Sequence, residues 1–254
     1  MELTPATAYW IGAVLTDGYF QQGRHRKSHY HRVVLSAIDR EMLEAVNEAN
    51  LELVGREYAI MHRPRKSGSK PFWVMQMTNA RLWEWGFQLT HGKQRIPPKL
   101  LRADDELRMP LLAGLMDGDG WVSLIGRSIQ IGIQASAPWV LDLKRMADSM
   151  KLPTSGPKVI HPPPGKPWST GRRLLFSVRP FVKADVPLRI ARKRERLEAW
   201  KLRVESSETA RSAYADLYLT DRKAYNRENQ REFRRRRKIQ SGLHGDMQSQ
   251  AETT

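Results

Sequence analysis

Two stretches of the chain carry an apolar helical pattern that runs directly into Asp-Gly. They are "AYWIGAVLTDGYF" at 8–20 and "LLAGLMDGDGWV" at 111–122. Each contains a small residue next to a glycine, Gly12 in the first and Gly114 in the second, which lets another backbone approach closely. The pattern predicts two helices that pack against each other with their C-terminal ends side by side. The glycine after each Asp is the residue type that usually ends a helix, so it predicts the C-terminus of each one.

The segments that follow the two helices repeat each other in outline. Alternating apolar positions and turn residues predict strands and helices in the same order in both halves. In the first half we expect strands at 19–24 and 30–37, a helix at 40–51 capped by Asp39, strands at 56–63 and 71–78, and a helix at 80–87 capped by Asn79. In the second half we expect strands at 121–126 and 128–136, a helix at 138–150 that starts with proline, and strands at 157–161 and 172–179. Each half therefore has the order αββαββα, which predicts an α+β duplication.

These elements divide the chain into five segments. We expect a first domain at 5–92, a linker at 93–108 in which Pro97-Pro98 prevents a continuous helix, and a second domain at 109–200. The sequence then turns into a basic helical tail at 201–238. Residues 239–254 show no periodicity, and we expect them to be disordered.

The net charge of the chain indicates the kind of partner that it binds. The chain has 43 Lys and Arg against 27 Asp and Glu, a net charge of +16, and residues 189–238 alone hold 17 basic and 8 acidic side chains. Such an excess favours nucleic acid over a lipid surface. No apolar run approaches the roughly 20 residues that span a bilayer, so no membrane partner is expected. The absence of cysteine excludes disulfides and fits an intracellular, reducing compartment, without indicating which one.

The position of the two carboxylates indicates the chemistry. An anion at a helix C-terminus is disfavoured by roughly 0.3–1 kcal/mol, and two carboxylates that meet repel each other. A divalent cation offsets both effects, and hard oxygen ligands favour Mg²⁺, for which Mn²⁺ can substitute. In a basic protein this arrangement suits hydrolysis of phosphodiesters by metal-activated water. A plain Asp-Gly turn is the alternative for either copy alone, but two matching copies argue against it.

At this point the motifs resemble a known family. "LAGLMDGDG" (112–120) is similar to the signature helix of LAGLIDADG homing endonucleases, and "WIGAVLTDG" (10–18) resembles the looser first motif of two-motif members. The resemblance implies a monomeric, pseudo-twofold enzyme for intron homing. Its two αββαββα domains would form a saddle of antiparallel sheets over a long site in double-stranded DNA.

The resemblance also implies roles for individual residues. Asp17 and Asp119 match the catalytic, metal-binding acids, one for each DNA strand, and the carbonyls of Thr16 and Gly118 would add metal ligands. The family uses a lysine near the end of each domain to organise water around the scissile phosphate. The matching residues are Lys93 with Arg95 as its rival, and Lys193 with Lys183 as its rival.

Basic strands and loops supply the expected DNA contacts, since arginine and lysine bind guanine edges and phosphates. The expected residues are Arg24, Arg26, Lys27, His29, Arg32, Arg63, Arg65, Lys66, Lys70, Arg127, Lys166, Arg172, Arg173, Arg234, Arg235 and Arg236. The last three lie in the tail, which would add affinity through phosphate contacts.

Three functions stay open at this level. The first is a site-specific double-strand DNA endonuclease that depends on Mg²⁺. The second is a maturase that binds group I intron RNA, and the third is a DNA-binding regulator that has kept the fold and lost catalysis. Retention of both carboxylates favours the endonuclease.

Overall fold

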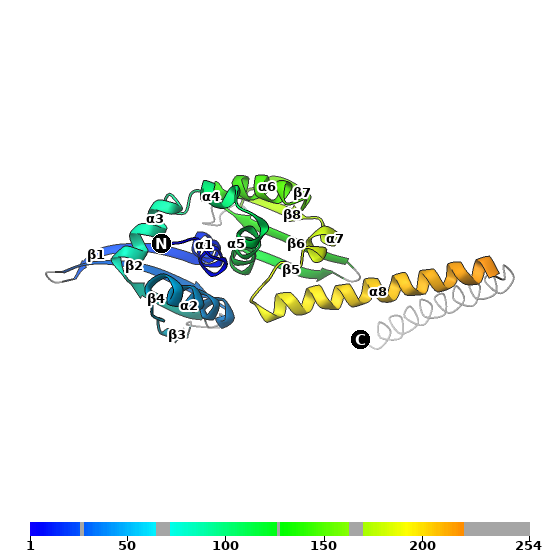
Figure 1. Cartoon of the computed structure of the whole chain (residues 1–254), viewed down its shortest axis with the longest axis horizontal. Coiled ribbons are helices and arrows are strands. Elements are labelled where there is room, and N and C mark those ends of the chain that lie inside the picture. Colours follow the sequence, from blue (N-terminus) through cyan, green and yellow to red (C-terminus); the bar gives the residue numbers. More distant parts are fainter. Residues whose placement is uncertain (26–27, 65–71, 126–127, 163–169, 221–254) are drawn as a thin grey trace, which may run out of the picture. The chain divides into compact units, whose positions relative to one another are not determined.

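The same order of elements occurs twice in the computed structural model, which describes residues 1–25, 28–64, 72–125, 128–162 and 170–220 (Figure 1). The first repeat consists of α1 (Pro5–Asp17), β1 (Gly18–His25), β2 (Ser28–Ala37), α2 (Arg40–Val54), β3 (Ile60–Arg63), β4 (Phe72–Thr78) and α3 (Ala80–Leu89). The second consists of α5 (Asp105–Gly118), β5 (Gly120–Ile125), β6 (Ser128–Ala135), α6 (Trp139–Ser149), β7 (Thr154–Ile160), β8 (Gly171–Phe176) and α7 (Val178–Lys183). The predicted α+β duplication is therefore confirmed.

Two further helices lie outside the repeats. The short α4 (Pro98–Leu101) begins at the proline pair between them, and α8 (Ala191–Thr220) follows the second repeat. The chain forms two compact units, residues 1–200 and 201–254, so both repeats belong to one unit. Among the described residues, none of the helices combines the length and apolar character that crossing a membrane requires.

Each repeat contains one four-stranded antiparallel sheet. The strand orders are β1-β2-β4-β3 and β5-β6-β8-β7, so the two sheets have the same topology. Their registers also correspond, because Gly18 pairs with Leu35 in the first sheet and Gly120 with Ile133 in the second. One face of each sheet is covered by helices and holds buried side chains such as Leu35 and Ile133.

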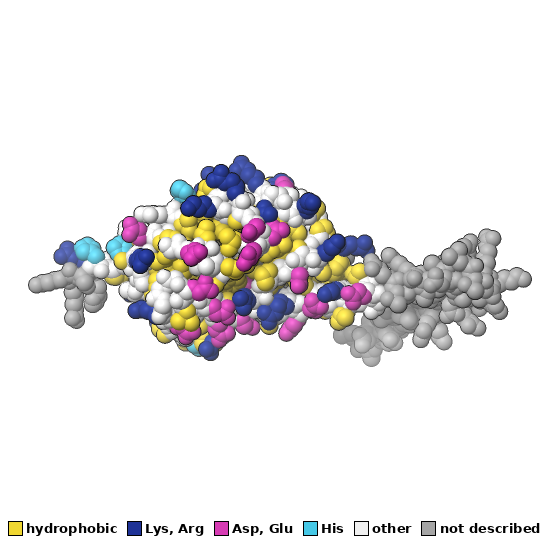
Figure 2. Space-filling view, in the orientation of Figure 1, with side chains coloured by type: hydrophobic (Ala, Val, Ile, Leu, Met, Phe, Trp, Pro, Cys, Tyr) yellow, Lys and Arg dark blue, Asp and Glu magenta, His cyan; other side chains and the backbone are white. Residues whose placement is uncertain are grey.

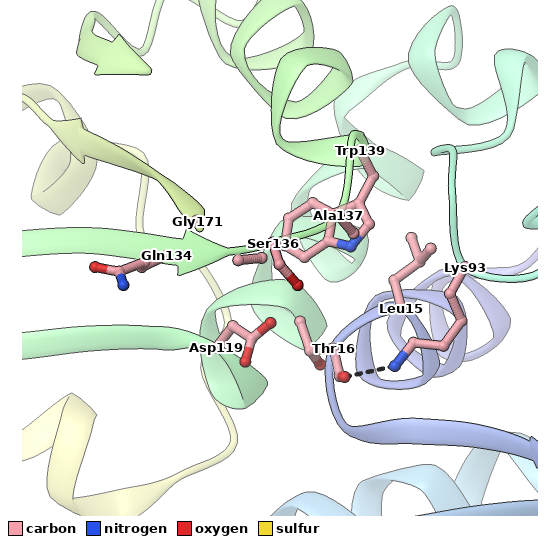
Figure 3. A pocket seen from close by; sticks show the side chains of 10 residues that line it. Leu15, Thr16, Lys93, Asp119, Gln134, Ser136, Ala137, Trp139 and Gly171 are labelled. Carbon is pink, nitrogen blue, oxygen red and sulfur yellow. Dashed lines mark hydrogen bonds between the residues drawn. The ribbon is translucent and has the colours of Figure 1, made fainter. Parts of the chain in front are cut away.

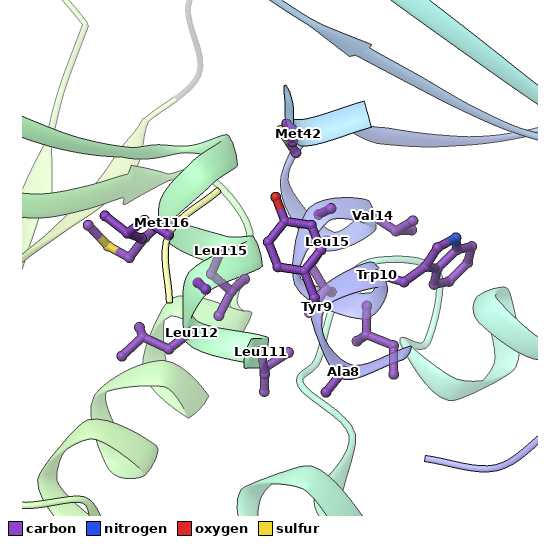
Figure 4. Packing of buried hydrophobic residues seen from close by; sticks show 14 of the residues in the cluster. Ala8, Tyr9, Trp10, Val14, Leu15, Met42, Leu111, Leu112, Leu115 and Met116 are labelled. Atoms are coloured by element: carbon purple, nitrogen blue, oxygen red, sulfur yellow. The ribbon is translucent and has the colours of Figure 1, made fainter. Parts of the chain in front are cut away.

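The two motif helices pack against each other at the centre of residues 1–200. Figure 4 shows Tyr9 between α1 and α5, while Trp10 and Val14 point away from α5 and Met116 points away from α1. The residues of both helices that the figure labels are buried in one continuous apolar cluster. This interface between α1 and α5, the seam, therefore joins the cores of both repeats.

The close approach of these helices depends on two glycines. A Cβ added to Gly12 would lie 2.8 Å from the backbone nitrogen of Leu115, and one added to Gly114 would lie 2.9 Å from that of Ala13. Real Cβ atoms essentially never come so near to backbone. The prediction that small residues let the helices meet is confirmed.

The local prediction is wrong in places. The strand expected at 172–179 ends at Phe176, and residues 178 and 179 belong to α7. Helix α1 ends before Gly18 as expected, with the glycine backbone extended at φ −78°. A Cβ there would lie 2.5 Å from the carbonyl oxygen of Val14, so the glycine serves a close approach. Asp39 precedes α2 but makes no side-chain capping bond, because its carboxylate binds Arg192. Asn79 does cap α3 as expected, accepting a hydrogen bond from the backbone N–H of Leu82 at 3.0 Å.

We predict that Gly114→Ala lowers the free energy of unfolding by about 1–3 kcal/mol, because the added methyl group must push the two helix backbones apart. Urea denaturation of the full chain measures this change. Gly171→Ala is the matched control, since its Cβ would meet its nearest neighbour at an ordinary 3.4 Å. An equal effect of both substitutions would contradict a glycine-dependent seam.

Candidate active site at the joined helix ends

Asp17 and Asp119 lie at the C-terminal ends of α1 and α5, where the charges of Lys93 and Lys193 act on both carboxylates. Burial, and then the negative charge of Asp119, raise the pKa of Asp17 to about 7. Burial raises the pKa of Asp119 to about 6, although the charges of Lys93 and Lys193 act in the opposite direction. Among the described residues, neither carboxylate has a hydrogen-bond or ion-pair partner. The two acids are thus crowded and poorly solvated, and the two lysines offset only part of the cost of their charge.

Lys93 reaches the end of the first motif helix. Its Nζ donates hydrogen bonds to the carbonyl oxygens of Thr16 at 2.7 Å and Gly18 at 2.6 Å. Carbonyls at a helix C-terminus carry partial negative charge and lack intrahelical partners, which makes an ammonium group a favourable neighbour. Burial nevertheless lowers the pKa of Lys93.

Lys193 repeats this arrangement at the second motif helix. Its Nζ donates to the carbonyl oxygens of Met116, Asp117 and Gly120 at 2.6, 2.8 and 2.8 Å. The side chain is only 1% exposed, and burial lowers its pKa to about 8. The two lysines are thereby held beside the two acids from positions 76 and 74 residues further along the chain.

The rival basic residues lie elsewhere. Arg95 forms a bidentate ion pair with the buried Asp142, with its Nε 2.7 Å from Oδ2 and its Nη2 3.1 Å from Oδ1. This pair fastens the linker after Lys93 to α6. Lys183 is exposed at the end of α7. Of the four candidates, the structure brings Lys93 and Lys193 to the motif ends.

The other motif carboxylate, Asp117, has a structural position that the sequence did not indicate. It is 3% exposed, and its Oδ2 accepts hydrogen bonds from the Tyr9 hydroxyl at 3.0 Å and the Arg189 backbone N–H at 2.7 Å. Asp117 therefore ties α1 and the segment before α8 to α5. Leu15 stands at the corresponding place in the first motif, so this contact exists in one half only.

A pocket of about 340 Å³ opens beside Asp119 (Figure 3). Lys93 and Thr16 line it from the first repeat, joined by the hydrogen bond drawn in the figure. Gln134 and Ser136 line it from the end of β6 and the turn that follows. Neither was a candidate from sequence, because only the pairing of the repeats brings this turn to the motif ends.

The residues present fit a divalent cation. The two carboxylates supply hard, anionic oxygen atoms, and since burial raises the pKa of both, a further cation beside them would be favourable. No cluster of three or more His, Cys, Asp or Glu that could hold a metal occurs among the described residues. Water and substrate phosphate would thus complete the ligand set. The Thr16 carbonyl, one of the expected extra ligands, already accepts the Lys93 hydrogen bond.

Strand register divides the described candidates for DNA contact between two faces. Arg32 pairs with Thr78, and its guanidinium donates to Gln76 Oε1 at 3.0 Å on the face away from the helices. Arg173 lies on the corresponding face of the second sheet, where its Nη2 donates to Gln134 Oε1 at 2.9 Å. Arg63 shares the face of Arg32 by register. Alternation turns Arg24, His29 and Arg172 to the opposite faces.

The remaining candidates lie outside the described residues. They are Arg26, Lys27, Arg65, Lys66, Lys70, Arg127, Lys166, Arg234, Arg235 and Arg236. On the face of the molecule in Figure 2, acidic and basic side chains are interspersed.

Comparison with known proteins identifies the architecture. Residues 4–85 match the model of the LAGLIDADG-like domain family. This match confirms the resemblance for the first repeat, although its motif is the looser copy. No curated protein sequence matches the chain significantly.

Solved structures share the fold over both repeats. The homing endonuclease I-DmoI in complex with DNA and Mn is similar at a TM-score of 0.51 and 12% identity, over 72% of this chain and 94% of that one. The homing endonuclease I-WcaI bound to its DNA recognition sequence is similar at a TM-score of 0.52 and 15% identity, over 78% and 88% of the two chains. At such identities the comparison establishes the fold.

We predict that, without divalent metal, stability falls as pH rises from about 4 to about 7. Folding raises the pKa of Asp17 from 3.8 to about 7, so in this range the folded protein holds a proton that the unfolded chain has released. Asp17→Asn removes the contribution of Asp17 and leaves the smaller one of Asp119, whose pKa burial raises to about 6. Its melting temperature in EDTA should match the wild type near pH 4 and exceed it by at least about 2 °C near pH 8.

Asp148→Asn is the control, because Asp148 is exposed and lies on α6. If the melting temperatures of wild type and Asp17→Asn changed in parallel with pH, the raised pKa of Asp17 in the folded protein would be contradicted.

Proposed function

We propose that this chain, with a LAGLIDADG-like first repeat and the fold of two-repeat homing endonucleases, is a site-specific endonuclease that cuts both strands of DNA. The observation that carries the proposal is the meeting of Asp17 and Asp119, each beside a lysine that binds main-chain carbonyls, at the joined ends of α1 and α5. The fold alone would not indicate catalysis, because function depends on the site.

Asp17 and Asp119 would hold the divalent ions, for which Mg²⁺ is the natural choice and Mn²⁺ a substitute. Such ions supply Lewis-acid stabilisation of a phosphodiester and activation of water. I-DmoI, which has this fold, has been solved with DNA and Mn and with DNA and Ca. One acid would serve each strand, so a monomer would suffice for a double-strand cut.

The lysines contribute through charge and position. Phosphodiester hydrolysis concentrates negative charge on the phosphate oxygens in the transition state, and preorganised cations beside them lower the barrier. Lys93 lines the pocket next to Asp119 with its ammonium group held by two carbonyls. Because these bonds already fix the side chain, little reorganisation is needed when a phosphate group enters.

DNA would lie along the sheet faces that carry Arg32 and Arg173. Each guanidinium is held by a glutamine side chain of a neighbouring strand, Gln76 or Gln134. Such pairing limits the rotamers of long side chains, which favours specific contacts with base edges over diffuse attraction. The net charge of +16 would add sequence-independent affinity for the backbone.

We predict Mg²⁺-dependent cleavage of one long site in a randomised duplex library, with no cleavage in EDTA. Asp119→Asn should lower the cleavage rate at least about a thousandfold while DNA binding is retained, because several kcal/mol of metal-ion stabilisation is lost. Sequencing of the cut ends and gel-shift titration measure the two effects. Asp148→Asn is the control, and full cleavage by Asp119→Asn would contradict the assignment of the acids.

We predict that duplex DNA containing the selected site binds at least about tenfold more tightly than a structured group I intron RNA of similar length. The arginines of the sheet faces lie on strands, and the major groove of DNA is wide enough to admit a pair of strands. The major groove of RNA helices is too narrow for side chains to reach the bases. Filter binding at one salt concentration compares the two. Tighter RNA binding would favour a maturase, and tight DNA binding without cleavage under any metal would favour a silent regulator.

A further inference from the structure

The two halves of the proposed active site differ at equivalent positions. Arg192 and Gly92 each stand directly before an active-site lysine, Lys193 or Lys93. Asp39 and Ala137 each stand two residues beyond the end of a central strand, β2 or β6. The pseudo-twofold relation of the repeats therefore matches the pair Arg192 and Asp39 with the pair Gly92 and Ala137.

In one half these positions are bridged by an ion pair. Arg192 Nε lies 2.8 Å from Asp39 Oδ1, and Nη2 lies 2.6 Å from Oδ2, which is a bidentate arrangement. It connects the start of α8 to the turn before α2, so it crosses from the second repeat to the first. The Asp39 side chain is 16% exposed and that of Arg192 is 47% exposed. A bidentate, partly buried pair of this kind is stronger and more directional than an ordinary surface ion pair.

In the other half the corresponding positions carry almost no side chain. Gly92 and Ala137 cannot form a bridge, and Ala137 lines the 340 Å³ pocket in which Asp119 and Lys93 are accessible. The turn around Ala137 thus borders open space (Figure 3). The turn around Asp39 is instead tied to α8.

We infer that the Asp39–Arg192 ion pair bars one of the two approaches to the joined helix ends, so that the two DNA strands are cut in a fixed order. This inference rests on the proposed function. The strand whose phosphate enters beside Ala137 is cut first. The other phosphate must displace a carboxylate–guanidinium bridge and approach the negative charge of Asp39, which slows the second cut.

The test follows both cuts on a supercoiled plasmid that carries the selected site, with each strand's cut assigned by end-labelled duplexes. The wild type accumulates nicked plasmid before linear product. The double variant Asp39→Ala, Arg192→Gly recreates the side chains of the open half. It should raise the second-strand rate about fivefold, the equivalent of about 1 kcal/mol, and leave the first-strand rate within about twofold.

Three further variants guard against trivial explanations. Asp39→Asn keeps the side-chain shape and removes the charge, so it should give the same direction of change even if the double variant folds poorly. Glu48→Gln disrupts a different ion pair between the repeats, Glu48–Arg189, in which both side chains are about half exposed, and it should leave both rates unchanged. Ala137→Leu fills the open pocket and should slow the first cut selectively.

The outcomes separate the inference from the function on which it rests. Equal rates for both strands in the wild type, or persistence of the nicked intermediate in both Asp39 variants, overturn the inference while the endonuclease stands. Absence of cleavage by the wild type and every variant with any divalent metal overturns the proposed function, and the inference falls with it.

Discussion

The burial of two helix C-termini side by side is the constraint on which the rest of the structure depends. Both ends expose carbonyl oxygens with partial negative charge, and each adds a carboxylate, Asp17 or Asp119, in a poorly solvated position. Such an arrangement is unfavourable unless cations are brought to it. Lys93 and Lys193 provide two of them, since each ammonium group binds main-chain carbonyls around the motif ends.

The same constraint explains the small residues of the seam. The helix ends can meet only if the helices cross closely, and Gly12 and Gly114 place backbone against backbone where any side chain would separate them. Apolar residues on the outer sides of α1 and α5 then belong to the cores of their own repeats. One pair of helices thus serves as interface, as part of both cores and as support for the acids.

The two repeats share topology and register but are not equivalent around the site. Asp117 binds Tyr9 and the backbone of Arg189, whereas Leu15 stands at its counterpart. Lys193 donates hydrogen bonds to three carbonyls and is almost completely buried, whereas Lys93 donates to two and borders a pocket. A duplicated fold in one chain allows such divergence, because each half can change without changing its partner. Asymmetry at the acids is consistent with a substrate whose two strands are not treated alike.

The sequence by itself determined the elements, their duplication, the glycine-dependent seam and the pair of acids. Each of these leaves a local signature, either a periodicity of apolar positions or a repeated motif, and α1 and α5 lie where the pattern put them. Tertiary structure alone decided which basic residue serves each motif, because Lys93 and Arg95 look alike in sequence and differ only in what surrounds them. It also decided that Asp39 binds Arg192, 153 residues away, instead of capping a helix. Strand register, in turn, decided that Arg32 and Arg24 lie on opposite faces of the first sheet. Such contacts depend on how distant segments pack, and no local pattern encodes the partner that a charged side chain finds.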